Sequence, residues 1–145
     1  MILKIKMTDP KATLPYRGTP YSAGLDLCAC LEQPHTLMPG EIAVIPTGIA
    51  MEIPCGQVGL VFARSGLGIK HGVALANGVG VIDSDYRGEI KVGLINQGAS
   101  PYTIAHGERI AQLAVMPVSF PDIELVEELS STQRGEGGFG STGKK

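Results

Sequence analysis

The sequence lacks any apolar run that approaches the length of a membrane span. Its first six residues alternate charged and apolar side chains instead of forming the apolar centre of a signal peptide, so we expect a β-strand there. An excess of positive charge is also missing, because the formal net charge is -2. These absences argue against a membrane protein, a membrane-surface binder and a general nucleic-acid binder.

Cysteine is scarce, and its spacing excludes two kinds of site. Cys28, Cys30 and Cys55 are an odd number with one C-x-C pair, which predicts no disulfide framework. On a strand, Cys28 and Cys30 would point to the same face as small buried side chains. The three histidines stand alone, so we expect no zinc site. This pattern favours a reducing, cytoplasmic location.

Glycine and proline are abundant, with 20 and 10 residues among 145, and they punctuate short apolar segments. This spacing is typical of an all-β domain, either a sandwich, a jelly roll or a barrel. Residues 64–71 alone have weak helical character, and we expect a single helical turn there. The expected strands are residues 2–7, 26–29, 36–38, 42–45, 50–53, 58–63, 73–76, 79–82, 89–95, 102–104, 110–115 and 123–126.

The composition changes after Val126, where the chain becomes polar and then glycine-rich. One interpretation is a disordered tail. The other is a phosphate-binding arm, because glycine-rich backbone beside hydroxyls and cations binds phosphates, and Phe139 would otherwise be an exposed aromatic residue without a role. Residues 138–144 fit most of a Walker A pattern, but Lys145 replaces its Ser or Thr and no helix can follow, so we reject a P-loop.

Residues 76–89 combine several groups that a ligand pocket would use. An Asn-Gly turn leads into the short apolar run 79–82, and a second turn, Asp-Tyr-Arg-Gly, follows. We expect a β-hairpin that presents backbone amides, a carboxylate and an aromatic ring at one mouth. Asp83 and Asp85 are either simple turn acids or divide two roles. In the second case one accepts a proton from water and the other fastens the turn through Arg87.

Three further segments each allow a structural and a functional interpretation. Arg64, Ser65 and Gly66 are either a surface arginine beside a helix cap or an anion-binding group at the end of a strand. Asp26 either satisfies a turn amide or helps to position a hydrated Mg²⁺. Gln112 lies within an apolar strand, where it belongs either to a core hydrogen-bond network or to a phosphate or metal-water contact.

Together these segments resemble the homotrimeric dUTPase family. Five motifs of that family occur in order, at residues 22–29, 63–67, 77–88, 107–113 and 134–143. The resemblance implies a jelly-roll-like β-domain, a distorted barrel, over residues 1–129. It also implies a flexible glycine-rich arm over residues 130–145 that closes over a neighbour's active site. Three sites would lie at the interfaces of a homotrimer.

The implied reaction is the Mg²⁺-dependent hydrolysis of dUTP to dUMP and diphosphate, with water attacking the α-phosphorus. This reaction keeps uracil out of DNA and supplies dUMP for dTMP synthesis. Asp83 matches the family's catalytic carboxylate, which orients and deprotonates that water. Tyr86 matches the ring that packs on deoxyribose and leaves no room for a 2′-hydroxyl.

The resemblance also assigns the remaining site residues. Asn77 and the backbone at Val81 and Ile82 match the groups that read the edge of uracil, and Lys91 matches a further position near the nucleotide. The phosphate-binding group matches Arg64, Ser65 and Gly66. Asp26 and Gln112 match groups that hold metal waters or phosphate. The arm residues that match substrate contacts are Arg134, Phe139, Gly140, Ser141 and Thr142, with Phe139 stacking on uracil.

Two other functions remain as alternatives. A dCTP deaminase of the same superfamily would need an acid beside the exocyclic amine of the base, whereas the mouth at Asn77 and Gly78 is neutral. A non-catalytic regulatory protein is disfavoured by the intact Asp83 and the intact arm. For a dUTPase, the resemblance implies dUTP as the small-molecule partner and self-association as a homotrimer, with no nucleic acid or membrane as a partner.

Overall fold

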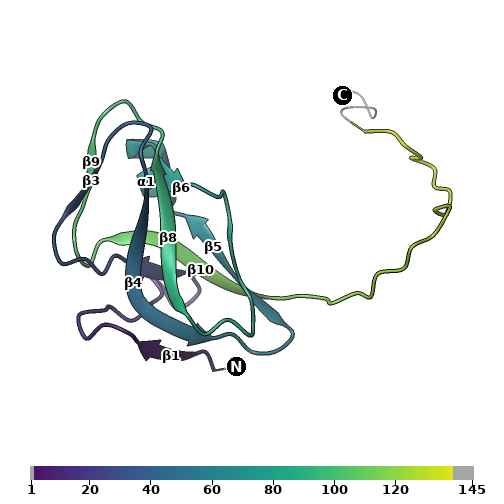
Figure 1. Ribbon diagram of the computed structural model, residues 1–145, viewed down its shortest axis with the longest axis horizontal. Coiled ribbons are helices and arrows are strands. Elements are labelled where there is room, and N and C mark those ends of the chain that lie inside the picture. The colour runs from purple at the N-terminus through teal and green to yellow at the C-terminus, as the bar shows by residue number, and fades with distance from the viewer. Residues whose placement is uncertain (1, 139–145) are drawn as a thin grey trace.

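The computed structural model describes residues 2–138, which form two four-stranded sheets, a small two-stranded sheet and one short helix (Figure 1). The first sheet has the order β1-β4-β8-β6, the second β2-β10-β5-β7, and β3 pairs with β9. The elements are β1 (Lys4–Met7), β2 (Leu25–Cys28), β3 (His35–Leu37), β4 (Ile42–Glu52), β5 (Gln57–Ala63), α1 (Ser65–His71), β6 (Val73–Leu75), β7 (Gly80–Ile82), β8 (Glu89–Asn96), β9 (Tyr102–Ile104) and β10 (Arg109–Pro117).

The core lies where the apolar faces of these sheets meet. In β8 the alternation is regular: Ile90, Val92 and Leu94 are buried, while Lys91 between them is exposed. Alternation of this kind places one side of a strand in the core and leaves the other side available for ligands. β4 is a single long strand where two were expected, and its pairing with β8 is irregular between Pro46 and Ala50. A proline lacks the backbone N–H needed for regular pairing.

The single helix confirms the expected helical turn. Arg64 is its N-cap with extended backbone angles, and no side chain caps that end. At the other end Gly72 adopts the left-handed conformation with a φ of 72°, which terminates the helix. The described residues contain no helix that is both long and apolar enough to cross a membrane.

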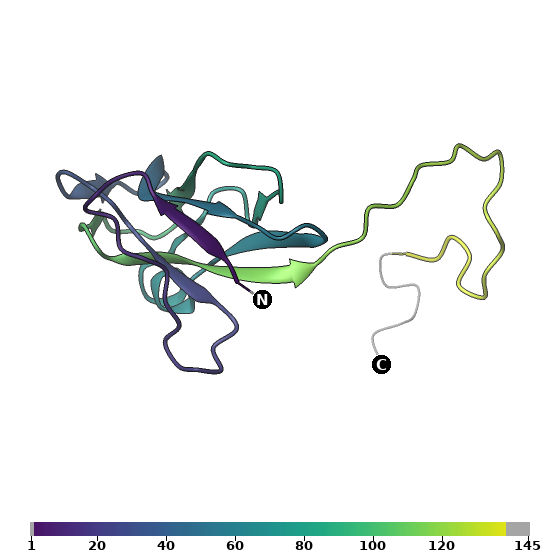
Figure 2. The same ribbon diagram turned by 90° about the horizontal axis from the view of Figure 1, so that it is seen from below.

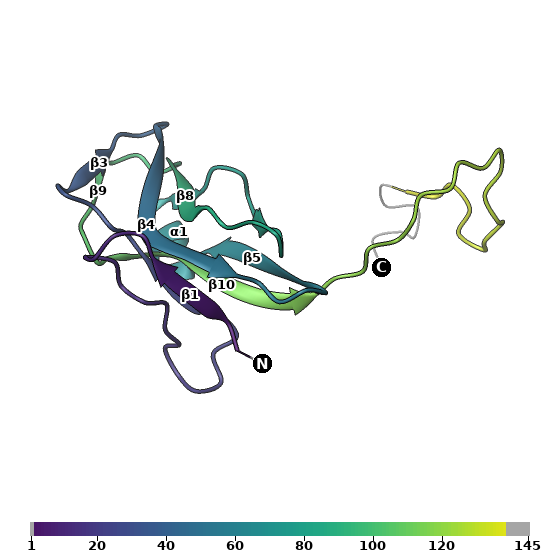
Figure 3. The same ribbon diagram turned by 60° about the horizontal axis from the view of Figure 1, so that its bottom comes forward.

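The chain leaves the body after β10. Val118 still donates its N–H to the carbonyl of Gly56 over 3.1 Å. Beyond it the chain runs away from the sheets in all three views (Figures 1, 2 and 3), and residues 118–138 contain no strand. The expected strand at residues 123–126 is therefore wrong. Ile123 and Leu125 are 98% and 97% exposed, so their apolar pattern is not buried against any part of this chain.

Candidate active site

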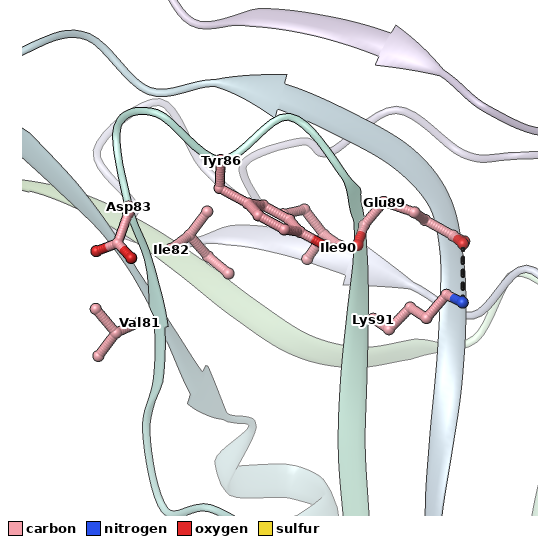
Figure 4. Close-up of a pocket in the computed structure, with 7 residues that line it drawn as sticks. All are labelled: Val81, Ile82, Asp83, Tyr86, Glu89, Ile90 and Lys91. Carbon is pink, nitrogen blue, oxygen red and sulfur yellow. Dashed lines mark hydrogen bonds and ion pairs between the residues drawn. The ribbon is translucent and has the colours of Figure 1, made fainter.

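A cavity of about 340 Å³ lies between β7 and β8, at the end of the molecule where the turn 83–88 connects them (Figure 4). The expected hairpin is wrong, because β7 pairs with β5 in one sheet and β8 pairs with β4 and β6 in the other. The two strands therefore diverge, and the turn joins two sheets. The cavity is lined by Val81, Ile82, Asp83, Tyr86, Glu89, Ile90 and Lys91.

Tyr86 is held across this cavity by its neighbours in the turn. Its hydroxyl donates a hydrogen bond to the backbone carbonyl of Glu89 over 3.0 Å. Gly88 makes this position possible, because a Cβ there would overlap the Tyr86 hydroxyl. In Figure 4 the ring extends from the turn towards β8 and forms one wall of the cavity. Its position is therefore fixed before any ligand binds.

Glu89 and Lys91 form the β8 side of the cavity. A carboxylate oxygen of Glu89 accepts the backbone N–H of Gly48 over 2.9 Å, and the other lies 3.6 Å from the Lys91 ammonium. Both Glu89 oxygens are therefore engaged. Lys91 remains more than half exposed, with 54% of its side chain accessible, so its cation is available at the mouth.

Asp83 projects from the opposite side of β7 to Ile82, beside Val81 (Figure 4), as strand alternation requires. Its carboxylate is exposed, and its backbone carbonyl accepts the N–H of Tyr86 to close the turn. The expected tie between Arg87 and a carboxylate is wrong. Arg87 instead donates to the backbone carbonyls of Ser84 and Tyr86, over 2.7 and 2.9 Å.

A second polar cluster lies on the other sheet. Asp26 of β2 and Gln112 of β10 are direct cross-strand partners, so their side chains share one face. Gln112 donates its amide to the carbonyl of Ala63, the last residue of β5, over 3.0 Å. Arg64 follows immediately, and its Nε lies 3.0 Å from an Asp26 oxygen. The structure therefore brings Asp26, Arg64 and Gln112 together.

Arg109 completes this cluster. Its Nη1 donates to the second Asp26 oxygen over 3.1 Å, and its backbone carbonyl accepts a hydrogen bond from Arg64. The hydrogen bond to Asp26 is the main cause that raises the pKa of the Arg109 guanidinium. Burial is the main cause that raises the pKa of the adjacent Cys28 thiol, and the Asp26 charge adds to it.

Ser65 and Gly66 begin α1 beside Arg64, and both are exposed. The first intrahelical hydrogen bonds are donated by Leu67 and Gly68 to the carbonyl of Arg64. The N–H groups of Ser65 and Gly66 precede these bonds and have no acceptor inside the helix. With the Ser65 hydroxyl not used as a cap, this end offers several donors to a ligand.

The two clusters lie at opposite ends of the β5–β7 pair. Gly59 faces Ile82 in that ladder, so Asp83 lies next to Val58, whereas Arg64 follows the far end of β5. Arg64 is six positions beyond Val58 along the strand, which corresponds to about 20 Å. Within one chain, Asp83 and Arg64 are therefore too far apart to contact the same phosphate.

The remaining predicted site residues are not part of either cluster. Asn77 is exposed in the turn before β7, where Gly78 has a φ of 73°, as the Asn-Gly signal indicated. Arg134 lies in the extended segment and bonds to the carbonyl of Gly137 over 2.8 Å. The four other arm positions, Phe139, Gly140, Ser141 and Thr142, lie outside the described residues.

A cation would find few direct ligands here. Within residues 2–138 no three His, Cys, Asp or Glu side chains are grouped to hold a metal ion. Both Asp26 oxygens already face arginines. These residues fit Mg²⁺ only as an ion that keeps most of its waters and binds substrate phosphates, which is its usual mode in nucleotide sites.

Glu89 and Arg109 were missed as site residues by sequence reasoning. Glu89 had a signal, because it is the first residue of a strand that follows the ligand-binding turn. Arg109 had none, since its approach to Asp26 depends on an irregularity in β10 that the sequence does not reveal.

The chain is similar to known proteins along nearly its whole length. The sequence model of a family described as dUTPase matches residues 10–143. A deoxyuridine 5'-triphosphate nucleotidohydrolase of Desulfitobacterium hafniense (strain DSM 10664 / DCB-2) is 53% identical over 146 residues, which cover 97% of each chain. The protein of the same description from Anaeromyxobacter sp. (strain Fw109-5) is 50% identical, covering 99% of this chain and 96% of its own.

Solved structures agree with the fold. A mutant dUTPase of Staphylococcus bacteriophage 80alpha, solved with dUpNHpp, superimposes with a TM-score of 0.89 at 32% identity, covering 98% of both chains. A mutant dUTPase from phage phi11 of S. aureus, described for the coordination of a structural Mg(II) ion, has a TM-score of 0.81 at 28% identity, covering 88% of this chain and 98% of its own. The expected β fold is confirmed, and the chain belongs to the dUTPase family.

Proposed function

We propose that this protein hydrolyses dUTP to dUMP and diphosphate by attack of water on the α-phosphorus, with Asp83 as the general base. The observation that supports this most directly is the cavity at β7 and β8, where an exposed carboxylate and a fixed tyrosine ring lie in the same turn. A carboxylate beside the sugar end of a nucleotide is suited to orient water and accept its proton. Phosphoryl transfer needs positioning and charge neutralisation more than a covalent nucleophile.

The same cavity accounts for the choice of nucleoside. The Tyr86 ring packs on the deoxyribose and excludes a 2′-hydroxyl, while backbone groups at Val81 and Ile82, together with Asn77, bind the edge of uracil. A site whose buried polar groups match one base rejects another strongly, because mismatched groups remain unpaired. Lys91 also lines the cavity and offers its cation to the nucleotide.

The second cluster binds the phosphates. Arg64, Ser65 and Gly66 supply a guanidinium, a hydroxyl and backbone N–H groups, and Gln112 supplies an amide. Asp26 and Gln112 would hold a hydrated Mg²⁺ through its waters, and the ion would supply neutralisation of phosphate charge. On the arm, Phe139 stacks on uracil, and Arg134 with residues 140–142 binds the phosphates after the arm closes.

A complete site then requires more than one copy of the chain. Because about 20 Å of β5 separates Asp83 from Arg64 in one chain, the base and the phosphate-binding group that serve one dUTP come from different copies. A homotrimer with sites between its subunits satisfies this requirement, since a cyclic arrangement repeats the same interface and closes.

Product analysis with dUTP, UTP and dCTP in the presence of Mg²⁺ tests this function. We expect dUMP and diphosphate from dUTP, much slower reaction of UTP, and no deamination. The control for deamination matters because a second acid, Glu89, lines the cavity together with Asp83. Formation of dUTP from dCTP would replace the proposal with deaminase activity.

The variant Asp83→Asn tests the base. The amide keeps the shape of the carboxylate but accepts no proton, so we expect kcat to fall by about a hundredfold or more while dUTP binding stays nearly unchanged. Asp85→Asn is the matched control, since Asp85 is also an exposed turn acid but does not line the cavity at β8. Turnover of Asp83→Asn equal to that of Asp85→Asn would exclude Asp83 as the base.

A further inference from the structure

Asp26 lies between two arginines. Its side chain is only 13% exposed, and one oxygen pairs with Arg64 at 3.0 Å while the other accepts from Arg109 at 3.1 Å. A second contact ties the arginines together, because the Nη1 of Arg64 donates to the carbonyl of Arg109 over 3.1 Å. The Nη2 group of Arg64 takes part in neither contact. Nη2 lies on the same edge of the guanidinium as Nε, and it is the group of Arg64 that remains for an anion.

A local irregularity in β10 puts Arg109 in this position. Gln112 pairs with Asp26 and Ala111 with Leu27, but Arg109 then pairs with Cys28, so β10 contains one extra residue. In a regular strand residues 109, 111 and 113 would share the buried face. The bulge buries both Ile110 and Ala111 and turns Arg109 to the side of Asp26. Bulges commonly re-aim a side chain in this way beside an active site.

We propose that Arg109 is a positioning residue for the triphosphate. By donating to the second oxygen of Asp26, it prevents Arg64 from forming a bidentate pair with that carboxylate. The Nη2 group of Arg64 therefore stays available for a phosphate. The inference rests on the proposed function and extends it to a residue that touches no substrate.

Arg64 and Arg109 compete for the carboxylate oxygens of Asp26. A guanidinium and a carboxylate prefer two parallel N–H to oxygen contacts, in which the carboxylate uses both oxygens. With Arg109 absent, the second Asp26 oxygen is free, and the Nη2 group of Arg64, on the same edge as Nε, can donate to it. Nη2 is then no longer available to a phosphate. Asp26 and Arg109 thus affect the phosphates through Arg64.

The first measurement is the affinity of the full-length variant Arg109→Ala for α,β-imido-dUTP, a non-hydrolysable triphosphate, and for dUMP. We expect about tenfold weaker binding of the triphosphate, corresponding to the loss of about one charged hydrogen bond. Binding of dUMP should stay unchanged, because dUMP lacks the β- and γ-phosphates. Equal weakening of both ligands, or of neither, overturns the proposal. Arg109→Gln serves as a second variant, and circular dichroism melting verifies that each is folded.

A double-mutant cycle separates positioning from direct contact. In the background Asp26→Asn the neutral amide no longer attracts Arg64 as a pair, so removal of Arg109 should change triphosphate affinity by less than about twofold. The same tenfold loss in both backgrounds would mean that Arg109 itself binds phosphate, which contradicts the proposal. Lys11 and Glu32 form an exposed ion pair elsewhere on the surface, and Lys11→Ala is the matched control for removal of a paired cation.

Failure of this inference is distinguishable from failure of the proposed function. If the unaltered protein releases no diphosphate from dUTP, the function is wrong. If the unaltered protein is active and the cycle shows no coupling between Asp26 and Arg109, the function stands and the positioning role is wrong.

Discussion

Gly66 is a residue whose identity the fold of this chain does not require. It lies in the first turn of α1, its φ is not positive, and no atom lies within 4 Å of the place where a Cβ would be. Alanine is the better helix former by about 1 kcal/mol. The requirement for glycine at position 66 must therefore come from a bound molecule. A phosphate that approaches the backbone closely would impose this requirement, because a Cβ would obstruct it.

Gly66→Ala should accordingly fold at least as stably as the unaltered protein and bind α,β-imido-dUTP about tenfold more weakly, a difference of about 1.4 kcal/mol. Gly68→Ala is a matched control, because it is the same substitution in the same helix and its Cβ would make only an ordinary contact with the carbonyl of Val73. Titration calorimetry and thermal melts of both variants provide the comparison. Equal affinity of the two variants would show that Gly66 does not approach the phosphate.

Single residues with a chemical signature were the easiest to predict. Asp83 and Tyr86 follow a turn signal, and the structure places both at one cavity. Asp26 and Gln112 were foreseen only as separate polar residues in apolar strands, yet their pairing in the ladder puts them on one face. Arg109 could not be predicted from the residues, since strand alternation would have buried it.

At the scale of elements, most strands and the helix follow the apolar segments and the Gly and Pro punctuation. The pairing of the strands does not. The run 79–82 was expected to belong to a hairpin, but its partner is β5, because sheet membership depends on contacts between distant segments. The run 123–126 has the composition of a strand but pairs with no segment within residues 2–138. A strand requires a neighbour, and composition alone does not supply one.

The turn between β9 and β10 depends on an ionisable contact. The Tyr102 hydroxyl donates to the carboxylate of Glu108, which also accepts the N–H of Ala105 over 3.0 Å. Burial is the main cause that raises the pKa of Tyr102 to about 12, and Glu108 adds to it. Since the unfolded phenol titrates near 10, its contribution is complete below pH 10 and is lost as the pH rises towards 12.

Tyr102→Phe should therefore be less stable than the unaltered protein at pH 8, by about 1 kcal/mol for the lost hydrogen bond. Its deficit should shrink between pH 10 and 12, because only the protein with Tyr102 loses this contribution there. Urea unfolding at pH 8, 10 and 11 measures the difference, which cancels the titration of the lysines common to both proteins. A deficit that stays constant with pH would contradict the raised pKa.

The arm is a second element with a separable role. Arg134 exchanges hydrogen bonds with Gly137, at the far end of a segment that leaves the body after β10. Removal of residues 134–145 should therefore leave the thermal unfolding temperature nearly unchanged. The value of kcat/KM for dUTP should fall by about tenfold or more, since an aromatic residue that stacks on a base contributes about 1–3 kcal/mol. Full activity of the shortened chain would show that the arm is only a tail.

At the scale of the whole molecule, neither cluster is a complete site. The cavity at β7 and β8 offers a base and a sugar wall, whereas the cluster around Asp26 offers cations and amides, and the β5–β7 ladder separates them by about 20 Å. Ladder register fixes this separation more firmly than any side-chain position, because a shift of one residue would turn every side chain to the other face. The proposed reaction therefore requires the assembly of chains.

Mixing two inactive variants tests this division. Asp83→Asn chains lack the base and Arg64→Ala chains lack the phosphate-binding guanidinium, so each variant alone should be nearly inactive. If a site takes Asp83 from one chain and Arg64 from another, random co-assembly of equal amounts restores about a quarter of the sites in a closed cyclic oligomer, because both halves of the site must come from intact segments.

Co-expression with two different tags, purification of the mixed oligomer and a diphosphate-release assay provide the measurement. Light scattering measures the mass of the oligomer and so gives the number of chains in it. No recovery in a verified mixed oligomer would mean that one chain supplies both groups, and that a rearrangement of the β5–β7 pair, absent from this structure, brings them together.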